Sequence, residues 1–551
     1  MSLKKFLPLL VVFSFLAAPL LATPSFKVRF GDDLRAGAVD GRLIVVVSTR
    51  DRGEPRFHVN WGLNTAQSFG VTVDGWKPGQ VTTVDGSAIG HPLHDLSQLP
   101  PGRYEVQALL NVYETFQRAD GKTVKLPADN GEGQQWSRSP GNLFSEPQSI
   151  EIKEDSVIEL TLSKEIPPID PPEESEYVRH FSMKSELLSE FWGRDVVLNA
   201  IVVVPHRFDE NKEARYPVFY NQGHFPSSQR AIYEELPNLE EVSDRRRAFM
   251  EPRVEFSKAW QSGEIEPALI VYTQHPTPYY DDSYGLNSAN MGPYGDALTK
   301  EFYPALERAF RGHGESWARI LYGGSTGGWM SIAQQIFYPD FFGGAWGFCP
   351  DPLDFHAFQL INVYDDSNAF FDVGTFKKIP RGIGRSGSGH MFTTVEDFTR
   401  QEQVLGTHGR SGGQLDAFHA TFGPVGDDGY PRPLWHPLSG EIDREVAEYW
   451  NANFDLTAKL QREWEAIGPA LVGKLHVTMG TKDTFYLDTA ATMMEAYLEA
   501  TGEEGNGVAY EGSFVYGDNE PHCYTATPSG QTLEQFYWPT WIKQTESMRS
   551  R

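Results

Sequence analysis

The first third of the chain, from about Phe26 to Ser163, consists of short runs in which apolar and polar residues alternate between turns rich in Gly, Pro and Asp. Alternation with a period of two is typical of strands that bury one face. Short strands separated by turn residues favour an antiparallel arrangement of two packed sheets. We therefore predict a β-sandwich domain over residues 23–163. Examples of the runs are Arg42–Ser48, Gly102–Val112, Ser149–Lys153 and Val157–Leu162.

A Pro-rich, acidic stretch, Ile166–Ser175, follows these runs. Proline removes a backbone donor and keeps the chain extended, so such a stretch is typical of a semi-rigid linker. We place a domain boundary here, with a linker over residues 164–177 and a second domain over residues 178–551.

Beyond this boundary, apolar runs of strand length alternate with helical patterns. This alternation is typical of the α/β class, in which helices cover both faces of a mostly parallel sheet. Residues 354–469 interrupt it with a segment rich in Gly and aromatic residues, which is too long for a structureless loop and which we interpret as an inserted cap. The apolar runs are Val196–Val204, Tyr216–Tyr220, Ala268–Tyr272, Ala318–Tyr322 and Lys474–Met479, and the helical patterns include Asp296–Phe310 and Trp329–Tyr338.

The first 22 residues have the pattern of a signal peptide. Two lysines precede a short apolar run, Phe6–Leu16, and Leu20–Ala22 offers a cleavage site. A retained membrane helix is the alternative, but two prolines interrupt a run that is already short. We expect a protein of the periplasm or the cell exterior, without stable membrane insertion.

Composition and charge narrow the classes of function. Hydrophobic residues make up 40% of the chain and aromatic residues 13%, which is enough for a large core and excludes a disordered chain. The formal net charge is −26, from 48 Lys+Arg against 74 Asp+Glu. Because no basic stripe is available to neutralise phosphates, we expect no nucleic-acid partner. Two cysteines exclude a disulfide scaffold and a multi-cysteine zinc framework.

The clearest chemical signal is the Gly-x-Ser-x-Gly turn Gly323–Gly327, with Ser325 at its centre. An apolar run enters the turn and a helical pattern leaves it, which is the strand–turn–helix context of a nucleophilic serine. The two glycines remove β-carbons that would clash in so tight a turn. The helix N-terminus also favours negative charge beside the serine hydroxyl. An ordinary Gly-rich turn, or a phosphate loop without its lysine, is the alternative interpretation.

A nucleophilic serine needs a base and the base needs an orienting acid, in the chain order Ser, acid, His. Asp483 comes on a loop directly after an apolar run and is the leading acid, with Asp488 further along as the alternative. His522 lies on a loop before the helical pattern that begins at Leu533, and its spacing from Asp483 leaves room for one helix and one strand. A polar loop histidine without a chemical role is the alternative for His522.

Several segments together resemble the esterase branch of the α/β-hydrolase superfamily, which contains enterochelin-esterase-like, feruloyl-esterase-like and S-formylglutathione-hydrolase-like enzymes. The resemblance covers about residues 180–350 and 470–545 and leaves out the predicted sandwich and cap. It implies an α/β-hydrolase fold with Ser325 as nucleophile, Asp483 as acid and His522 as base. The segments are Tyr216–Tyr220 with Gly223, Tyr284–Asp296, the Gly-Gly-Ser-Thr-Gly-Gly turn and Gly480–Leu487.

An oxyanion hole in this fold uses the backbone N–H of the residue after the nucleophile and a second N–H from the loop after the first core strand. The first donor is here Thr326, and the second is Gly223 or His224. Family members often carry His-Gly at the second place, whereas this chain reads Gln222-Gly223-His224. The sequence leaves the second donor open between these two residues.

Two cysteines flank these candidates, because Cys349 ends the apolar run Gly344–Phe348 and Cys523 adjoins His522. Both are expected near the carboxyl edge of the sheet, where a disulfide would fix the histidine loop in an oxidising compartment. Two unrelated buried thiols are the alternative. The remaining histidines have no metal-binding spacing, so we expect no metal and no cofactor.

The sequence thus predicts a secreted serine hydrolase that cleaves carboxylic esters through an acyl-enzyme, the ester being a small molecule or linked to a polysaccharide. The predicted sandwich would be an accessory module. The same three side chains also serve acyl transfer and peptide-bond cleavage, and a catalytically inert binding protein is an alternative from another class. The acyl group, the alcohol and the oligomeric state are not predicted.

Overall fold

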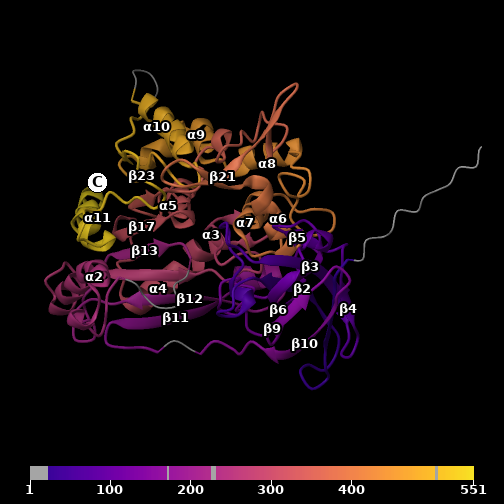
Figure 1. Cartoon of the computed structure of the whole chain (residues 1–551). Coiled ribbons are helices and arrows are strands. Elements are labelled where there is room, and N and C mark those ends of the chain that lie inside the picture. Colours follow the sequence, from indigo (N-terminus) through magenta and orange to yellow (C-terminus); the bar gives the residue numbers. More distant parts are fainter. Residues whose placement is uncertain (1–22, 171–172, 225–230, 503–506) are drawn as a thin grey trace, which may run out of the picture.

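The computed structural model describes residues 23–170, 173–224, 231–502 and 507–551. The predicted signal peptide, residues 1–22, lies outside these ranges. Within them, no helix is both long and apolar enough to cross a membrane. Figure 1 shows the N-terminal strands on one side of the molecule and a helix-covered sheet on the other.

Ten strands of the described N-terminal segment join into one sheet. They are β1 (Ser25–Phe30), β2 (Val39–Ser48), β3 (Gln67–Trp76), β4 (Thr82–Val84), β5 (Ile89–His91), β6 (Gly102–Gln117), β7 (Thr123–Pro127), β8 (Leu143–Ser145), β9 (Gln148–Ile152) and β10 (Val157–Glu165), with the short turns η1 (Pro55–Phe57) and η2 (Leu96–Gln98). Their order is β4-β1-β10-β8-β6-β2-β3-β5, with β7 and β9 paired to the long β6. The sheet packs around a core of its own. The predicted strands are present, but the division into two packed sheets is not confirmed.

Strand β2 shows why one predicted run is apolar throughout. Every second residue from Leu43 to Val47 contributes to the core of the N-terminal sheet. Ile44 and Val46 belong to a second cluster, which includes Leu405 from much later in the chain. Because both faces of the strand are buried, both sets of residues are apolar.

Arg42 in the same strand ties the N-terminal sheet to that later segment. Its guanidinium is buried and donates hydrogen bonds to the carbonyl oxygens of Gln403 and Val404, at 2.7 and 2.8 Å. Burial lowers the pKa of this guanidinium to about 10. The two carbonyl oxygens therefore compensate the burial of the Arg42 charge. The pattern of apolar residues in the strand does not predict a buried arginine.

The second part of the chain builds an eight-stranded sheet. Its strands are β11 (Val178–Ser185), β12 (Val196–Val203), β13 (Val218–Gln222), β14 (Leu269–Gln274), β17 (Arg319–Gly324), β18 (Gly344–Phe348), β23 (Leu475–Gly480) and β24 (Ser513–Gly517). They lie in the order β11-β12-β14-β13-β17-β18-β23-β24. The pairs β11–β12 and β12–β14 are antiparallel, and each following pair is parallel. The five predicted runs all fall on strands of this sheet, with ends shifted by two residues at most.

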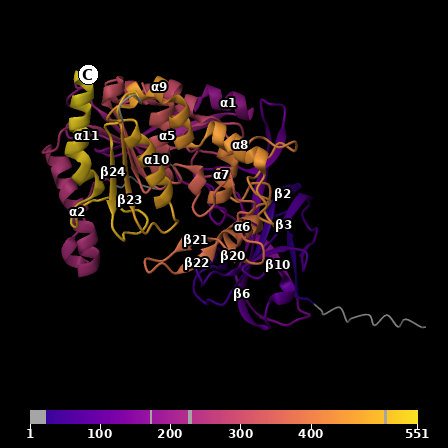
Figure 2. The same ribbon diagram turned by 90° about the horizontal axis from the view of Figure 1, so that it is seen from above.

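Helices cover both faces of this sheet, which confirms the predicted α/β class (Figures 1 and 2). Neighbouring residues of β13 point to opposite layers, because Phe219 packs on Trp538 of the last helix and Tyr220 packs on Tyr303 of an earlier one. The helices are α1 (Glu186–Trp192), α2 (Asp244–Ser262), α3 (Tyr294–Asp296), the π-helical turn η4 (Ala297–Phe302), α4 (Tyr303–Phe310), α5 (Thr326–Phe337), α9 (Leu456–Leu471), α10 (Asp488–Ala500) and α11 (Leu533–Ser550), with η3 (Leu239–Glu241), η5 (Ser316–Ala318) and the short pair β15 (Asn287–Ser288) and β16 (Gly292–Pro293). The two predicted helical patterns fall on η4 with α4 and on α5.

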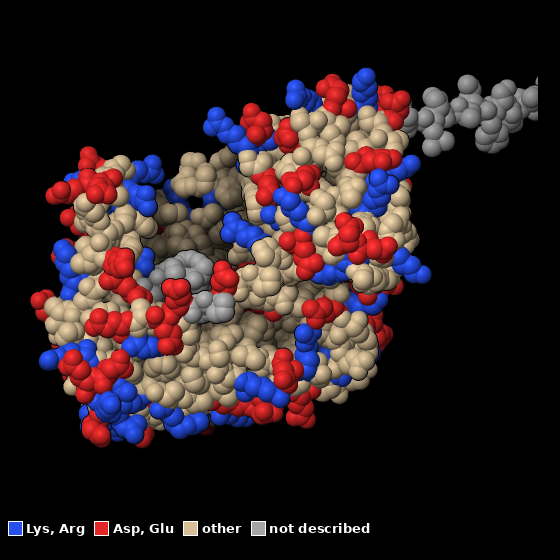
Figure 3. Space-filling model, turned by 90° about the horizontal axis from the view of Figure 1, so that it is seen from below, with Lys and Arg blue, Asp and Glu red and all other residues tan. Residues whose placement is uncertain are grey.

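Between β18 and β23 the chain leaves the sheet and forms an insertion. Its elements are η6 (Phe355–Ala357), β19 (Phe371–Val373), β20 (Lys378–Pro380), β21 (Gly382–Arg385), β22 (Met391–Thr394), α6 (Val395–Leu405), α7 (Gln414–Phe422) and α8 (Arg444–Asn453). Helix α6 contacts β3 and β5, so the insertion joins the N-terminal sheet to the second one (Figure 1). The predicted range 354–469 also takes in most of α9, which packs on α5 as part of the helical layer. Seen from below, the molecule has a hollow, and acidic and basic side chains are intermixed over the side in view (Figure 3).

Candidate active site

Ser325 occupies a strained turn between β17 and α5, with its backbone in the left-handed region at φ 56°. Its N–H donates to the carbonyl oxygen of Phe348 on β18 at 2.9 Å, which fixes the turn to the sheet. The two glycines are required by close packing. A β-carbon on Gly323 or Gly327 would lie 2.6 or 2.0 Å from the carbonyl oxygen of Gln222. This strained, glycine-flanked turn is the geometry that the motif predicts.

The structure brings Ser325, His522 and Asp483 together. Nε2 of His522 lies 2.9 Å from Oγ of Ser325, and Nδ1 lies 2.6 Å from Oδ2 of Asp483. Asp483 is fully buried, and its Oδ1 accepts the backbone N–H of Phe485 at 2.8 Å. Ser325 follows β17, Asp483 follows β23 and His522 follows β24, so all three lie at the carboxyl edge of the sheet. There they form a continuous hydrogen-bonded chain.

Asp488, the alternative acid, has a different partner. It begins α10 and pairs with Arg385 of the insertion, with Nη2 and Oδ1 2.9 Å apart. Nε of Arg385 donates to the backbone carbonyl of Asp483 at 2.8 Å. Asp488 therefore anchors an arginine that supports the Asp483 loop, and in the described chain no hydrogen bond joins it to His522.

The imidazole of His522 has the electrostatics of a base. Burial alone would lower its pKa, but the hydrogen bond to Asp483 and the contact with Cys523 raise the pKa above the usual value of about 6.5. In its neutral form, an imidazole that donates from Nδ1 to a carboxylate turns the lone pair of Nε2 toward Ser325. The arrangement can therefore accept the proton of the serine hydroxyl.

The predicted oxyanion donors lie beside this turn. Thr326 is the first residue of α5, so its N–H has no acceptor within the helix. Gly223 follows β13 with φ 126° and approaches the same helix, since a β-carbon on it would lie 3.5 Å from the α-carbon of Gly327. Of the two alternatives for the second donor, Gly223 therefore lies beside the first turn of α5.

The side chain of His224 is held by two carboxylates. Its Nδ1 lies 2.6 Å from Oδ2 of Asp281 and 3.6 Å from Oδ2 of Asp282. Burial opposes protonation, but the two carboxylates raise the pKa of the imidazole to about 9. The two carboxylates therefore favour the protonated form of His224, a feature that the sequence alone did not predict.

A polar network that the sequence did not predict lies beside the nucleophile. Tyr284 and Thr326 donate their hydroxyls to Oδ2 of Asp351, at 2.9 and 3.1 Å. Gln414 of α7 donates to the hydroxyl of Tyr284, so the insertion reaches the site. Asp351 comes shortly after β18, and an acid on a loop after a strand is the signal that identified Asp483. Gln414 has no such signal, because only the packing of the insertion brings it here.

Cys349 and Cys523 are free thiols, so the predicted disulfide is not formed in this structure. The alternative of two unrelated buried thiols is also wrong, because Cys523 is exposed and the two sulfur atoms and one ring nitrogen of His522 lie within 4.8 Å of one another. The contact between the thiols raises the pKa of Cys349, with burial adding to the effect. The same contact lowers the pKa of Cys523 to about 5, against burial and together with His522.

Two other groups of potential ligand side chains are close enough together to hold a cation. In both groups, contacts within the protein account for the close approach. The first is the His224 imidazolium with its two carboxylates. The second joins Asp354, His356 and Asp455. In that group Asp455 accepts hydrogen bonds from the N–H of Phe355 and the hydroxyl of Tyr364, at 2.9 and 2.6 Å.

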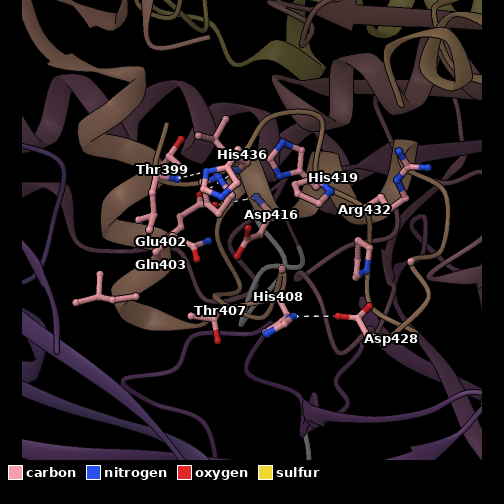
Figure 4. A pocket seen from close by; sticks show the side chains of 18 of the residues that line it. Thr399, Glu402, Gln403, Thr407, His408, Asp416, His419, Asp428, Arg432 and His436 are labelled. Carbon is pink, nitrogen blue, oxygen red and sulfur yellow. Dashed lines mark hydrogen bonds and ion pairs between the residues drawn. The ribbon is translucent and has the colours of Figure 1, made fainter. Parts of the chain in front are cut away.

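A cavity of about 830 Å³ opens in the insertion, lined by its residues 399–438 and by one residue of β5. Figure 4 shows Glu402, Asp416 and His419 on its wall. The three side chains of the hydrogen-bonded chain are not among its lining residues. Helix α7 contributes to both places, because Gln414 contacts Tyr284 and Thr326 beside the nucleophile while Asp416 and His419 line the cavity.

The order of the strands, the strained serine turn after β17, and the acid and histidine after β23 and β24 define an α/β-hydrolase fold. The predicted fold class is therefore confirmed.

No protein-family model matches this chain, and no curated protein matches it in sequence. Among solved structures it is similar to a ferulic acid esterase, with 14% identity over 68% of this chain and 98% of that one and a TM-score of 0.31. It is also similar to an S-formylglutathione hydrolase from Agrobacterium tumefaciens, with 12% identity over 67% and 95% and a TM-score of 0.34. A third is an S-formylglutathione hydrolase from Staphylococcus aureus, with 12% identity over 68% and 99% and a TM-score of 0.31.

Proposed function

We propose that this chain is a serine hydrolase that cleaves carboxylic esters. The observation that carries the proposal is the hydrogen-bonded chain from Ser325 through His522 to Asp483, at a strained turn that begins a helix. A serine with this geometry has a base within reach of its proton, and the base has a buried carboxylate to orient it.

The first half of the reaction forms an acyl-enzyme. Oγ of Ser325 attacks the ester carbonyl carbon while its proton passes to Nε2 of His522, and Asp483 stabilises the imidazolium. The tetrahedral intermediate then collapses, and His522 gives the proton to the oxygen of the departing alcohol. The acyl group remains as an ester of Ser325.

The second half releases the acid. A water molecule replaces the alcohol, His522 accepts its proton, and the hydroxide oxygen adds to the acyl carbon. Collapse of this intermediate breaks the bond to Oγ of Ser325, which takes its proton back from His522.

Backbone N–H groups would stabilise the oxyanion of both intermediates. Thr326 is the first donor and Gly223 the favoured second donor, since its backbone closely approaches the start of α5. Loss of one such donor costs about 3–4 kcal/mol of transition-state stabilisation.

We place the reaction outside the cytoplasm, on the strength of the signal-peptide pattern in residues 1–22. The substrate class is a carboxylic ester, either a small molecule or one linked to a polysaccharide. The N-terminal sheet is an accessory part that supports the insertion through Arg42.

Hydrolysis of p-nitrophenyl acetate, p-nitrophenyl butyrate and methyl ferulate tests the proposal. Ser325→Ala should reduce kcat/KM by about 10⁴-fold or more with an unchanged circular dichroism spectrum. The matched control is Ser547→Ala, at an exposed serine of α11, which should retain full activity. Hydrolysis that persists in Ser325→Ala would refute the assignment of the nucleophile.

A further inference from the structure

The sulfur atoms of Cys349 and Cys523 and a ring nitrogen of His522 form a compact group of three. These ligand atoms lie within 4.8 Å of one another. Cys349 is fixed in the interior after β18, and Cys523 lies on the irregular segment between β24 and α11. The group thus combines a buried ligand beside the sheet with an exposed ligand on a loop.

The backbone at both cysteines is unusual. Cys349 has φ 39° and Cys523 has φ 66°, in the left-handed region where glycine or asparagine is the common choice. The chain therefore places thiols at two positions where the local conformation favours other residues. Both of these cysteines have their sulfur atom close to the ring of His522.

The third ligand already has the support that metal-binding histidines require. Such a histidine almost always donates its other ring N–H to a carboxylate or carbonyl, which fixes the ring and the tautomer. Nδ1 of His522 lies 2.6 Å from the buried Asp483, and Nε2 lies 2.9 Å from Oγ of Ser325, so a metal ion that binds Nε2 has to displace the serine hydroxyl. The remaining ligands are thiolates, which prefer Zn²⁺ and other thiophilic ions.

We propose that Cys349, Cys523 and His522 form a binding site for Zn²⁺, with water in the fourth position. In a tetrahedral site with Zn–S of about 2.3 Å and Zn–N of about 2.0 Å, neighbouring ligand atoms lie roughly 3.5–3.8 Å apart. Since the present separations are at most 4.8 Å, the ligand atoms would have to approach one another by no more than about 1 Å. Binding converts the Cys349 thiol to a thiolate and releases its proton to solvent, whereas the lowered pKa of Cys523 already favours the thiolate.

A metal ion at this site removes the base from the serine. Nε2 of His522 cannot coordinate Zn²⁺ and accept the proton of Ser325 at the same time. The ion therefore acts as a reversible inhibitor; this consequence rests on the proposed function, whereas the binding itself does not.

Titration of the reduced full chain with Co²⁺ tests the binding independently of hydrolysis. A thiolate-to-cobalt charge-transfer band should grow to one equivalent and disappear on addition of Zn²⁺. Cys349→Ser and Cys523→Ser should each weaken the band strongly, while His356→Ala, at a separate group of potential ligands, should leave it intact. Blocking the wild-type thiols with iodoacetamide checks the same ligands without a substitution.

The inhibition is measured on ester hydrolysis. Zn²⁺ should inhibit the wild type and a chelator should restore the activity. Cys349→Ser and Cys523→Ser, each measured against its own activity with chelator present, should tolerate at least tenfold more Zn²⁺. A reduced chain without the charge-transfer band, or a band that survives both cysteine substitutions, would overturn the site. A Cys349–Cys523 disulfide that persists under reductant would overturn it as well. If the cobalt band forms as expected but neither wild type nor variants hydrolyse esters, the proposed function fails and the metal site stands.

Discussion

The α-carbon of Gly327, in the first turn of α5, lies against the carbonyl oxygen of Gln222 at the end of β13. A β-carbon on residue 327 would come within 2.0 Å of that oxygen. We expect Gly327→Ala to push the serine turn away from β13 and to lower kcat/KM for p-nitrophenyl esters by at least about 100-fold, since small displacements of a catalytic group cost that much. The matched control is Gly387→Ala, where a β-carbon meets no neighbouring atom and the activity should not change.

The pH dependence of kcat/KM should report the environment of His522. Asp483 and Cys523 raise the pKa of the imidazole, against burial, so the ascending limb should have its midpoint above about pH 6.5. Cys523→Ser removes the negative sulfur but not the acid, so the midpoint should move to lower pH. Profiles of both proteins are recorded with reductant and chelator present. A midpoint at the same pH in both would show that the thiol does not act on the base.

A buried ion pair supports the nucleophile strand. Arg319 of β17 and Glu307 of α4 make two contacts, at 2.7 and 3.0 Å, and both side chains are almost fully buried. Arg319→Met removes the only cation that pairs with this buried carboxylate among the described residues, so the free energy of unfolding should fall by about 3–5 kcal/mol in a urea titration.

The exposed pair of Arg207 and Glu210, 2.8 Å apart, provides the comparison. Arg207→Met should change the free energy of unfolding by less than about 1 kcal/mol, because solvent screens this pair. Equal effects of the two substitutions would contradict a special role for burial at Arg319.

Two buried carboxyls of the insertion make stability depend on pH. Burial raises the pKa of Asp416 from 3.8 to about 6, and burial together with Asp416 raises that of Glu402. A raised pKa favours folding only while the group is protonated, so this contribution is complete below about pH 4 and is lost as the pH rises through 6.

Asp416→Asn should therefore become more stable relative to the wild type between pH 4 and pH 8, by on the order of 2 kcal/mol. Thermal unfolding across this range measures the difference. Asp427→Asn, at an exposed residue on the same cavity, should differ from the wild type by less than about 0.5 kcal/mol at each pH. A stability difference for Asp416→Asn that does not change with pH would contradict the argument.

The sequence predicted the candidate catalytic residues because, in this fold, they follow successive strands in a fixed order along the chain. Ser325, Asp483 and His522 each occupy a loop after a strand. The apolar strands and the glycine turn can be recognised from neighbouring residues alone, without knowledge of the tertiary structure. The five predicted strands agree with β12, β13, β14, β17 and β23 of the eight-stranded sheet to within two residues, because continuous apolar runs are typical of strands buried on both faces.

The remaining features depend on contacts between distant parts of the chain. Gln414 contacts Tyr284 and Thr326, beside the nucleophile, only through the packing of the insertion. The buried charge of Arg42 is compensated by carbonyl groups more than 300 residues away. Alternation in the N-terminal strands indicates which residues face inward, but not whether the strands form one sheet or two. The cysteines were expected near the base, yet no pattern in the sequence decides between a disulfide and two thiols.

Reaction with a fluorophosphonate probe tests the central claim most directly, because only an activated serine is phosphonylated. The intact chain should gain the mass of one probe, peptide mapping should locate it on Ser325, and His522→Ala should react far more slowly. A chain that hydrolyses esters while the probe leaves Ser325 unmodified, or modifies another residue, would contradict the account.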